Sequence, residues 1–436
     1  MADATSASEN RVDTSNLRTP VESPRGSKGP AVLVIAGLGN SGKVERHLGP
    51  LAAVASETTV VCVRAGPDVE GITYREAPTF GEAPGLRKIP GLGKVPGVGG
   101  RLAGIVTMLF VALAEALRGD YDAVASISLV PYGYFALAVG KIARLPTHLG
   151  IIGADLDLHA TAWYGLLIRA AFRRFTAISV PGNDHLQRLV RMGVPPDRIS
   201  ILANAVDADR YRPEAGRGSA GQDASAGPTE GSTNTEGSTD TESSTEYDIL
   251  WVGRFSPEKD PLLFVRALGE LADRGVAFEA AMVGSGSLET NVRRERAAHG
   301  VVDRLDLPGW VDDPLPYYGR SSTFVLTSER EGLPLSLLEA MVVGVAPVVP
   351  DVGSVTDVAV DGETALVVDE RTPKAFADAL EQLLTDDAFR SEIADETPTI
   401  RGSYSYAAAR DDWRHILVTM GCLDRHPSKL ENEPVS

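Results

Sequence analysis

Two glutamates, Glu331 and Glu339, stand eight positions apart in the segment SEREGLPLSLLEAMVVGVAP (328–347). A carboxylate is a strong acceptor for paired hydroxyl groups, such as neighbouring hydroxyls of a sugar. An apolar helical pattern fills the segment, with Pro334 suited to the first helical position and Gly344 to the position just past the helix end. Amides at a helix N-terminus favour phosphate oxygens. The segment is therefore equipped to bind hydroxyls and phosphate together.

A pair of cations follows an earlier apolar run, in the segment VGRFSPEKDP (252–261). Arg254 offers a rigid guanidinium fork that fits phosphate oxygens, and Lys259 offers a compact point charge. Lys259 is the only lysine in a stretch of more than two hundred residues, which suggests a demand for that charge. We interpret the two cations as holders of a diphosphate. The alternative is a surface ion pair with Glu258 or Asp260.

The elements that would position the glutamates are a strand, a loop and a helix. Apolar runs at 323–327 and 345–349 predict buried strands on either side of the helix, which makes one βαβ unit. In such a unit, ligands lie beyond the carboxyl ends of the strands, near helix N-termini. Glu331 would lie in the loop and Glu339 one to two turns into the helix. Both are then expected to face one ligand.

Strands and helices alternate along most of the chain, which predicts an α/β fold. Predicted strands cover 31–37, 59–65, 122–130, 147–155, 176–182 and 198–206, and then 247–253, 277–284, 304–309, 323–327, 345–349 and 365–368. Predicted helices cover 43–56, 102–118, 134–142, 164–174 and 184–192, and then 257–274, 287–299 and the region after 373. Apolar strands separated by helices favour a parallel sheet covered on both faces. Two such halves predict two Rossmann-like, doubly wound domains that face each other across a ligand-binding cleft.

The composition divides the chain into five segments. A polar tail, 1–29, lacks the apolar core of a signal peptide and is predicted to be disordered. The first α/β domain is expected over 30–213 and the second over 247–403. Between them, 214–246 is rich in Gly, Ser, Thr and Glu and is predicted to be a flexible acidic linker. A second short tail is expected over 423–436.

The charge balance excludes some classes of function. The formal net charge is −17, whereas nucleic-acid binding needs a basic surface. Only eight of the 42 basic residues are lysine, and abundant acids with few lysines fit a salt-rich, halophilic cytosol. The only cysteines, Cys62 and Cys422, predict neither a disulfide framework nor a cysteine-based zinc site. Because no apolar run is long enough to cross a membrane, we expect a cytoplasmic protein.

Three further segments complete a resemblance to a known family. They are ILANAVDADRYRP (201–213), MVGSGSLETNV (282–292) and LPGWV (307–311). Together with the spacing of the two glutamates, they make the chain from about residue 30 to 420 resemble the retaining GT-B glycosyltransferases of group 1, family 4. Glycogen synthase and sucrose-phosphate synthase belong to this group. The chain departs from the family pattern at Ala205, where glycine is usual.

The resemblance implies a role for each charged residue named above. Arg254 and Lys259 would hold the leaving diphosphate of a nucleotide-diphospho-sugar and stabilise the negative charge that develops on it. Glu339 would bind the ribose hydroxyls and Glu331 the hydroxyls of the donor sugar. No metal and no other cofactor is implied. The anomeric configuration would be retained, by front-face attack of the acceptor hydroxyl.

The same resemblance assigns main-chain contacts to the donor and the acceptor side to the first domain. Amides around Gly332, Leu333, Pro334 and Leu335 would meet the sugar and the diphosphate. The other donor-binding residues that it implies are Gly253, Gly284, Gly309 and Asn204. A final helix at about 404–422, around Trp413, would pack back on the first domain.

The first domain carries less of the family pattern. The family often has His-Gly-x-Asp at a strand end, and the matching segment IGADLDLH (152–159) has Ile152, Gly153 and Asp155. Asp155 is therefore a candidate catalytic residue that contacts the acceptor or the donor sugar, while the family's histidine is replaced. His159 either reaches the same space from the following loop or is a surface residue.

The segment GLGNSGK (37–43) satisfies most of a Walker A loop, which makes a P-loop NTPase one competing interpretation. Val44 stands where Ser or Thr would hold Mg²⁺. In the family interpretation, Gly39 and Gly42 let the backbone approach the acceptor or the donor phosphates closely. Two more interpretations stay open at this point: a non-hydrolysing nucleotide-sugar epimerase on the same fold, and a non-catalytic nucleotide-sugar binder.

The acceptor would be a glycan or a lipid-linked molecule. The segment 86–110 is basic and apolar within an acidic chain. One interpretation is that it rests on an anionic bilayer, at the inner face of the cell membrane, and receives a lipid-linked acceptor there. The other interpretation is an acceptor-cleft loop of a soluble enzyme.

Overall fold

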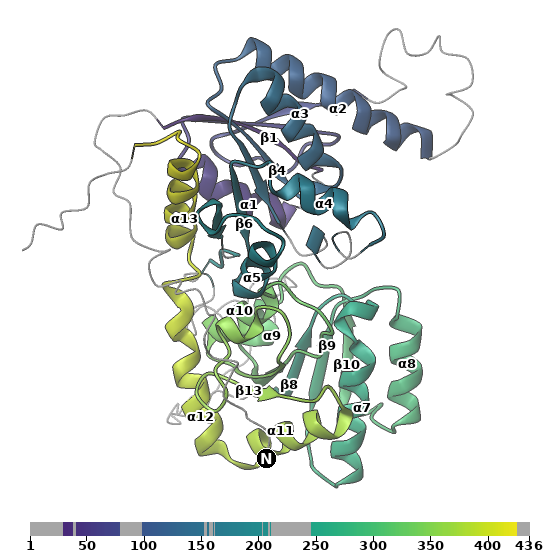
Figure 1. The fold of residues 1–436 in the computed structure, drawn as a ribbon. Helices are drawn as coiled ribbons and strands as arrows, with labels where there is room; N and C mark the ends of the chain where they lie inside the picture. The colour runs from purple at the N-terminus through teal and green to yellow at the C-terminus, as the bar shows by residue number, and fades with distance from the viewer. Residues whose placement is uncertain are drawn as a thin grey trace, which may run out of the picture. The chain divides into compact units, whose positions relative to one another are not determined.

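The computed structural model describes residues 29–37, 41–78, 98–151, 155–156, 160, 162–202, 204–207, 210 and 246–424, without the side chains of 41–45 and 98–103. These residues form two compact units (Figure 1). Unit 1 comprises the chain up to Ala205 together with the chain from Tyr406 onward, and unit 2 comprises Val206–Ser405. The predicted linker 214–246 lies outside the described residues except for Glu246, and the two predicted tails lie outside them except for Gly29, Leu423 and Asp424.

Unit 1 is built on a seven-stranded sheet in which all neighbouring strands are parallel. Its strands are β1 (Ala31–Ile35), β2 (Glu57–Cys62), β3 (Ile72–Glu76), β4 (Ala123–Ile127), β5 (Thr147–Gly150), β6 (Ala177–Val180) and β7 (Ile199–Ile201). They lie in the order β3-β2-β1-β4-β5-β6-β7. The chain therefore winds outward from β1 in one direction and then, after β3, crosses to the other side.

Helices cover both faces of this sheet. They are α1 (Ser41–Ala52), α2 (Val98–Arg118), α3 (Tyr134–Ala143), α4 (Gly165–Phe172), α5 (Asn183–Arg191) and α13 (Tyr406–Thr419), with short turns η4 (Leu129–Gly133) and η6 (Pro196–Arg198). Successive strand residues point to opposite faces. Leu33 and Ile35 accordingly pack in the core under α2 to α5, whereas Val32 and Val34 pack in the core under α1 and α13.

The last helix, α13, belongs to unit 1 although the chain reaches it from unit 2. Trp413 is 3% exposed, and its indole N–H donates to the carbonyl oxygen of His47 over 3.1 Å. Its ring also meets the buried imidazole of His148 edge to face, with 4.9 Å between ring centres. Burying a large aromatic ring gives a substantial apolar stabilisation, and the indole finds its hydrogen-bond partner as well.

Unit 2 has a six-stranded parallel sheet in the order β10-β9-β8-β11-β12-β13. The strands are β8 (Tyr247–Val252), β9 (Ala280–Val283), β10 (Leu305–Gly309), β11 (Ser321–Val325), β12 (Ala346–Pro350) and β13 (Leu366–Val368). The helices are α7 (Pro261–Asp273), α8 (Glu289–Ala298), α9 (Leu315–Tyr318), α10 (Leu335–Val343), α11 (Pro373–Thr385) and α12 (Asp387–Glu396), with short turns η7 (Pro257–Lys259), η8 (Val355–Asp357) and η9 (Thr397–Arg401).

The predicted fold class is confirmed: each unit is a parallel α/β sheet with helices on it. Several predicted elements end at other residues, and the short helix α9 was not predicted. Two further details of the prediction were wrong. The helix predicted over 257–274 is broken at Asp260, whose left-handed φ of 45° separates η7 from α7. The strand β3 was not predicted, because its sequence ITYRE is largely exposed and lacks the apolar run of a buried strand. Edge strands with one free side often carry such polar sequences.

Candidate functional site

The candidate site lies at the carboxyl-terminal edge of the unit 2 sheet. β8 leads into the loop with Arg254 and Lys259, and its neighbour β11 leads into the loop with Glu331. The chain order reverses between these two strands, since β9 and β10 lie on one side of β8 and β11 to β13 on the other. Ligands of open parallel sheets bind at such a switch point. The topology thus joins two predicted motifs that are distant in the sequence.

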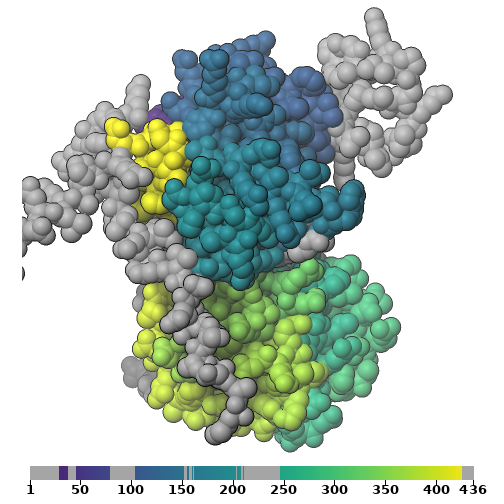
Figure 2. Space-filling view, in the orientation of Figure 1, coloured from purple at the N-terminus to yellow at the C-terminus, as the bar shows by residue number. Residues whose placement is uncertain are grey.

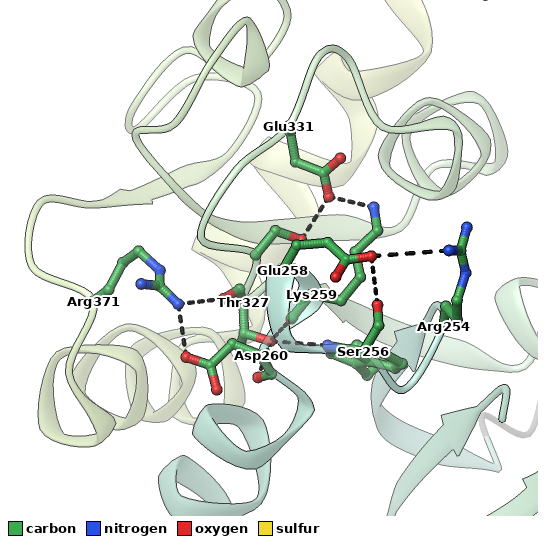
Figure 3. A network of polar contacts seen from close by, with 10 residues as sticks. Arg254, Ser256, Glu258, Lys259, Asp260, Thr327, Glu331 and Arg371 are labelled. Carbon is green, nitrogen blue, oxygen red and sulfur yellow. Dashed lines mark hydrogen bonds and ion pairs between the residues drawn. The ribbon is translucent and has the colours of Figure 1, made fainter. Parts of the chain in front are cut away.

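Lys259 and Glu331 form the centre of the site (Figure 3). The Lys259 ammonium lies 2.5 Å from Oε1 of Glu331, and the Ser328 hydroxyl donates to the same oxygen over 2.5 Å. The two paired side chains are only 23% and 8% exposed. Such a pair fixes both side chains, because moving either one leaves a shielded charge without its partner. The partner of Lys259 is therefore neither of the adjacent acids that the sequence offered.

Arg254 is the more open of the two cations. Its side chain is 69% exposed, and its guanidinium lies 3.9 Å from Oε1 of Glu258, which is a long ion pair. The Ser256 hydroxyl donates to the same oxygen over 2.7 Å. Burial alone would raise the pKa of Glu258, but the Ser256 hydrogen bond and the nearby Arg254 and Lys259 charges outweigh it and hold that pKa below its usual value. Glu258 thus stays a carboxylate that keeps the guanidinium close to the site.

Hydrogen bonds of the Asp260 and Thr327 side chains hold the loop that carries Lys259. The Asp260 carboxylate accepts from the amide of Leu263 over 3.3 Å and caps the N-terminus of α7. The Thr327 hydroxyl donates to the carbonyl oxygens of Lys259 and Asp260, over 3.1 and 3.0 Å. It accepts in turn from the indole N–H of Trp251 over 3.0 Å. The left-handed backbone at Asp260 is uncommon for a residue with a side chain. It is stabilised by the hydrogen bonds to Leu263 and Thr327, and Trp251 in turn fixes the Thr327 hydroxyl.

Arg371 completes this support from the loop after β13. Its guanidinium lies 2.7 Å from Oδ2 of Asp260 and donates to the carbonyl oxygen of Thr327 over 3.0 Å. Figure 3 shows it on the far side of Asp260 from Lys259. The side chain is 25% exposed. A planar guanidinium suits this position because it can bind a carboxylate and a carbonyl oxygen at the same time.

The helix α10 carries the second glutamate. Glu339 is 5% exposed, and its Oε2 accepts from the hydroxyl of Tyr318 over 3.1 Å. The helix begins at Leu335, with Pro334 as its N-cap, so the predicted first helical position is shifted by one residue. Gly344 ends it as predicted, in a left-handed conformation with φ 94°. The segment Gly332–Leu335 thus leads directly into the N-terminus of α10, and amides at a helix N-terminus favour an anion.

Three of the predicted glycines close the ends of neighbouring strands. Gly253 donates its N–H to Val283 over 3.0 Å, and Gly284 donates to Gly309 over 2.8 Å. A Cβ on Gly284 would lie 1.8 Å from the carbonyl oxygen of Gly253, and its φ of 138° is strained for other residues. Gly353 likewise allows a close backbone approach, here to the Glu331 loop. Its φ is 59°, and a Cβ there would lie 1.9 Å from the carbonyl oxygen of Glu331.

The predicted residues of unit 1 form no comparable cluster among the described residues. Asp155 is 1% exposed and accepts from the Ser128 hydroxyl and the Leu129 amide, over 3.1 and 3.0 Å. These bonds support Ser128, whose backbone has φ 70°. Asn204 is half-buried in the segment after β7, and Gly42 lies in the first turn of α1.

The remaining unit 1 predictions fall on residues that the structure does not describe. These are Gly39, Gly153, His159 and residues 86–97 of the segment 86–110, whose remaining residues belong to α2. Contacts of any predicted residue with a donor or an acceptor stay predictions.

Sequence reasoning missed four residues that shape the site. Ser328 and Thr327 stand beside Glu331, so their place after a predicted strand was the available signal. Tyr318 and Arg371 reach the site from separate elements. Nothing in the local sequence of either residue indicates a polar partner so far along the chain.

The described residues contain neither a candidate metal-binding cluster nor a helix suited to span a membrane. No group of three or more His, Cys, Asp or Glu side chains in these parts of the chain could hold a metal ion. Among the helices that the structure describes, none is long and apolar enough to cross a membrane.

Two family models match the chain. The model described as Glycosyltransferase Family 4 matches residues 52–210, of which 52–205 belong to unit 1 and 206–210 to unit 2. The model described as Glycosyl transferases group 1 matches residues 236–399, which contain both cations and both glutamates of the candidate site. The two matches follow one another along the chain and leave the final helix outside both.

Curated relatives align with only part of the chain. An α-D-kanosaminyltransferase of Streptomyces kanamyceticus is 31% identical over 177 residues, which are 40% of this chain and 46% of that protein. A D-inositol 3-phosphate glycosyltransferase of Rhodococcus opacus is 28% identical over 250 residues, which are 55% of this chain and 51% of that protein. The chain thus spans about half the length of the curated relatives that it matches.

Solved structures share the fold over nearly the whole chain. HepE of Anabaena, crystallised with UDP and glucose, has a TM-score of 0.68 and 14% identity, and the match covers 90% of this chain and 100% of that one. Sucrose-phosphate synthase of Thermosynechococcus elongatus has a TM-score of 0.63 and 16% identity, with 90% and 97% covered. At such low identity these structures establish the two-domain α/β fold.

Proposed function

Because this chain belongs to the group 1 glycosyltransferases, we propose that it transfers a sugar from a nucleotide-diphospho-sugar to a hydroxyl group of a glycan or a lipid-linked acceptor. Both family models describe glycosyltransferases. A related fold has been crystallised with UDP and glucose, which supports a nucleotide-sugar donor for this chain.

The observation that carries the proposal is the Lys259–Glu331 pair at the switch point of the unit 2 sheet. A nucleotide-sugar presents a diphosphate next to a ring of hydroxyls. The pair offers a cation and a carboxylate 2.5 Å apart, so one ligand can meet both where its phosphate joins its sugar. The exposed Arg254 supplies a second charge for the diphosphate, and the N-terminus of α10 supplies amides.

The proposed chemistry is electrostatic. Departure of the nucleoside diphosphate leaves negative charge on its terminal phosphate, and two fixed cations stabilise that charge as it develops. Glu331 would hold hydroxyls of the sugar while its anomeric carbon becomes cationic, and Glu339 would hold the ribose. We further propose that no metal takes part and that the acceptor hydroxyl attacks on the face from which the diphosphate leaves, which retains the configuration.

The proposed acceptor is supported by the names of relatives of this chain. The relatives' names include an inositol phosphate glycosyltransferase and a lipopolysaccharide core glycosyltransferase of Rhizobium meliloti. A polyhydroxylated acceptor, free or attached to a lipid, is consistent with those names. Contact of the segment 86–110 with a membrane, and a cytoplasmic location at the inner face, stay predictions from the sequence.

The test is incubation of the full chain with radiolabelled nucleotide-sugars and a mixture of glycan and lipid-linked acceptors. We expect label in an acceptor product, and we expect Glu331→Gln to lower the rate by about a hundredfold or more, as loss of a transition-state contact does. The matched control is Glu295→Gln, a partly buried glutamate on α8 of unit 2 that pairs with Arg266. It should leave the rate unchanged.

Three results would contradict the proposal. An isomerised donor would indicate an epimerase, and donor binding without turnover of any sugar would indicate a non-catalytic binder. Transfer that is equally fast in Glu331→Gln and wild type would remove the site from the reaction.

A further inference from the structure

The helix α2 is apolar on two opposite sides. Met108 and Ala112 are fully buried against the sheet of unit 1. Val106 and Phe110, about half a helical turn away on either side, are 51% and 66% exposed, and Leu117 farther along the same outer side is 61% exposed. A helix that covers a sheet normally carries polar residues on its outer side. The outer side of α2 therefore departs from the pattern of a solvent-facing helix.

The helix α4 repeats this departure. Ile168 and Phe172 are buried against the sheet, whereas Leu166 and Leu167 are 78% and 69% exposed. Trp163, two residues before the helix, is 94% exposed. Tryptophan is costly to leave in water and is enriched where one side of a protein is apolar and the other wet. We refer to Val106, Phe110, Leu117, Trp163, Leu166 and Leu167 as the apolar helical face.

These helices lie on one side of the unit 1 sheet. α2, α3, α4 and α5 bury their inner residues in a single core cluster (Figure 1). α3 packs directly on α2, and its outer residue Ile142 is 57% exposed, beside the exposed Lys141. In the space-filling view, blue and teal atoms of this part of the chain form a surface on the viewer's side (Figure 2). The outer apolar residues thus lie on helices that cover the same face of the unit 1 sheet.

Unit 2 shows what an ordinary surface of this protein looks like. Its large hydrophobic residues with a high exposure, among those that the structure describes, are Val302, Trp310 and Val360. They stand singly, in three separate segments outside the helices. Single exposed hydrophobics are normal, whereas a gathering on one face marks an interaction site.

The charges on the same helices have the opposite sign to the chain as a whole. The formal net charge of the protein is −17. α3 and α4 contain Lys141 and Arg169 and no acidic residue. α2 contains one acid, Glu115, which pairs with Arg75 over 3.3 Å, and it ends at Arg118. A layer that is apolar outside and basic is complementary to a surface that is apolar inside and anionic.

We propose that the apolar helical face docks on an anionic lipid bilayer, with Trp163, Leu166 and Phe110 in the boundary between headgroups and acyl chains and the basic residues at the headgroups. Apolar side chains with flanking cations are the combination that binds such a surface. The face belongs to unit 1, whereas the proposed donor-binding residues belong to unit 2, and docking needs no spanning helix. The proposal goes beyond the proposed transfer reaction, because bilayer binding needs neither donor nor acceptor.

The first test is sedimentation of the full chain with vesicles of phosphatidylcholine alone or mixed with phosphatidylglycerol, at low and high salt. We expect binding to the anionic vesicles, weaker at high salt because the cations contribute. The double variant Leu166→Glu/Leu167→Glu should lower the bound fraction at limiting lipid by about tenfold or more. The control is Val302→Glu/Val360→Glu in unit 2, which adds the same charge and should bind as wild type does. Melting temperatures of both variants establish that they are folded.

The second test uses fluorescence. Among the tryptophans, Trp163 and Trp310 are exposed, whereas Trp251 and Trp413 are buried. Anionic vesicles should shift the emission of wild type and of Trp310→Phe to shorter wavelength and leave that of Trp163→Phe unshifted.

Several outcomes would overturn the proposal. One is an absence of binding to anionic vesicles at low salt, and another is equal loss in the two glutamate double variants. A third is self-association of the free protein that is abolished by Leu166→Glu/Leu167→Glu, because the face would then belong to a second copy of the chain.

Discussion

The two units share an architecture and differ in what stands at the carboxyl ends of their strands. In unit 2, described residues from the ends of β8, β11 and β13 form one connected polar network around Lys259 and Glu331. In unit 1, the acid at the corresponding edge, Asp155, is buried and supports the turn after β4. The same fold thus carries a connected polar site in unit 2, whereas the acid in the described part of unit 1 has a structural contact.

This difference indicates which of the two proposed substrates, the donor or the acceptor, a rigid fold can bind with a preformed site. A diphosphate presents the same charges whatever sugar it carries, so a rigid arrangement of cations and amides serves every turnover. Such an arrangement needs support from below, and unit 2 provides it through Asp260, Thr327 and Arg371. Acceptors are more varied, and residues 38–40 and 86–97 of the segments expected to meet them lie outside the described residues.

The largest effect is expected from removing the central cation. Lys259→Ala deletes the only partner of Glu331 that carries a positive charge among the described contacts. In the proposed reaction it would leave the developing phosphate charge with Arg254 alone. We expect the transfer rate to fall by about a hundredfold to a thousandfold. The measurement is kcat/KM with a saturating acceptor.

The matched control for this variant is Lys374→Ala. Lys374 is a 74% exposed lysine that pairs with Asp378 within α11 of the same unit. It should leave kcat/KM unchanged, and circular dichroism should show both variants folded. Equal activity of Lys259→Ala and wild type would break the contrast between the two units, because the network of unit 2 would then be structural as well.

A smaller effect is expected from the support beneath the cation. Arg371→Ala removes two hydrogen bonds that hold Asp260 and Thr327, and through them the backbone of Lys259. We expect kcat to fall by about tenfold with little change in donor affinity, because the described contacts of Arg371 support the backbone of Lys259 through Asp260 and Thr327. Arg371→Lys should recover only part of the loss, since an ammonium cannot reproduce the planar fork.

A matched comparison separates positioning from general stability. Arg274 also pairs with two carboxylates, Asp378 and Glu381, but on the outside of α7. Arg274→Ala should cost some stability and leave kcat unchanged. If Arg371→Ala lowers only the melting temperature, in proportion to Arg274→Ala, its role in positioning the cation is refuted.

Much of unit 2 could be predicted from the sequence because its signals are local. The strand before Glu331, the helix after it and the closing glycine are adjacent in sequence. β11 begins two residues before the predicted strand, α10 begins one residue after the predicted position, and Gly344 ends the helix as expected. The break at Asp260 was not foreseen, since Pro261 and the residues after it continue an apolar helical pattern. The left-handed residue is stabilised by Thr327 and Arg371, which are 67 and 111 residues away. Tertiary contacts of that kind leave no mark on local propensity.

Unit 1 shows the complementary limit. Its alternating strands and helices were predictable from apolar runs, yet β3 was missed because an exposed edge strand carries no such run. Asp155 was singled out by resemblance, and its burial under Ser128 and Leu129 follows from how the chain turns after β4. The described contacts of Asp155 place its carboxylate beside Ser128 and Leu129, and its contact with an acceptor or a donor sugar stays a prediction.

Unit 1 also contains a buried histidine, His148, whose protonation should make the free energy of unfolding depend on pH. His148 is fully buried between β4, β6 and α13, and burial lowers the pKa of its imidazole from 6.5 to about 3. Its Nε2 faces the Ser179 hydroxyl at 3.0 Å, and its Nδ1 has no hydrogen-bond partner among the described residues. The folded state therefore holds this histidine neutral.

The sign of the pH dependence follows from these two values. Below pH 6.5 the unfolded chain binds a proton on this histidine and the folded chain does not, down to about pH 3. His148 therefore does not lower the free energy of unfolding above pH 6.5. Between pH 6.5 and about pH 3 it lowers that free energy by about 1.4 kcal/mol for each pH unit. Denaturant unfolding of wild type and His148→Gln between pH 7 and pH 5 measures this, and the variant should show the shallower slope. Identical slopes would mean that the imidazole takes up its proton while folded.

The smallest effect is expected at the hydroxyl that holds the second glutamate. Tyr318→Phe deletes the 3.1 Å hydrogen bond to Oε2 of Glu339 and keeps the ring, which is fully buried against Phe324. A hydrogen bond of this kind contributes about 1 kcal/mol, so KM for the donor should rise by about fivefold while kcat stays near that of wild type. Glu339→Gln should raise KM further, because it weakens the acceptor itself. A fall in kcat with KM unchanged would instead assign Glu339 to the transition state, and the whole α10 end of the site would then belong to the chemical step along with Lys259.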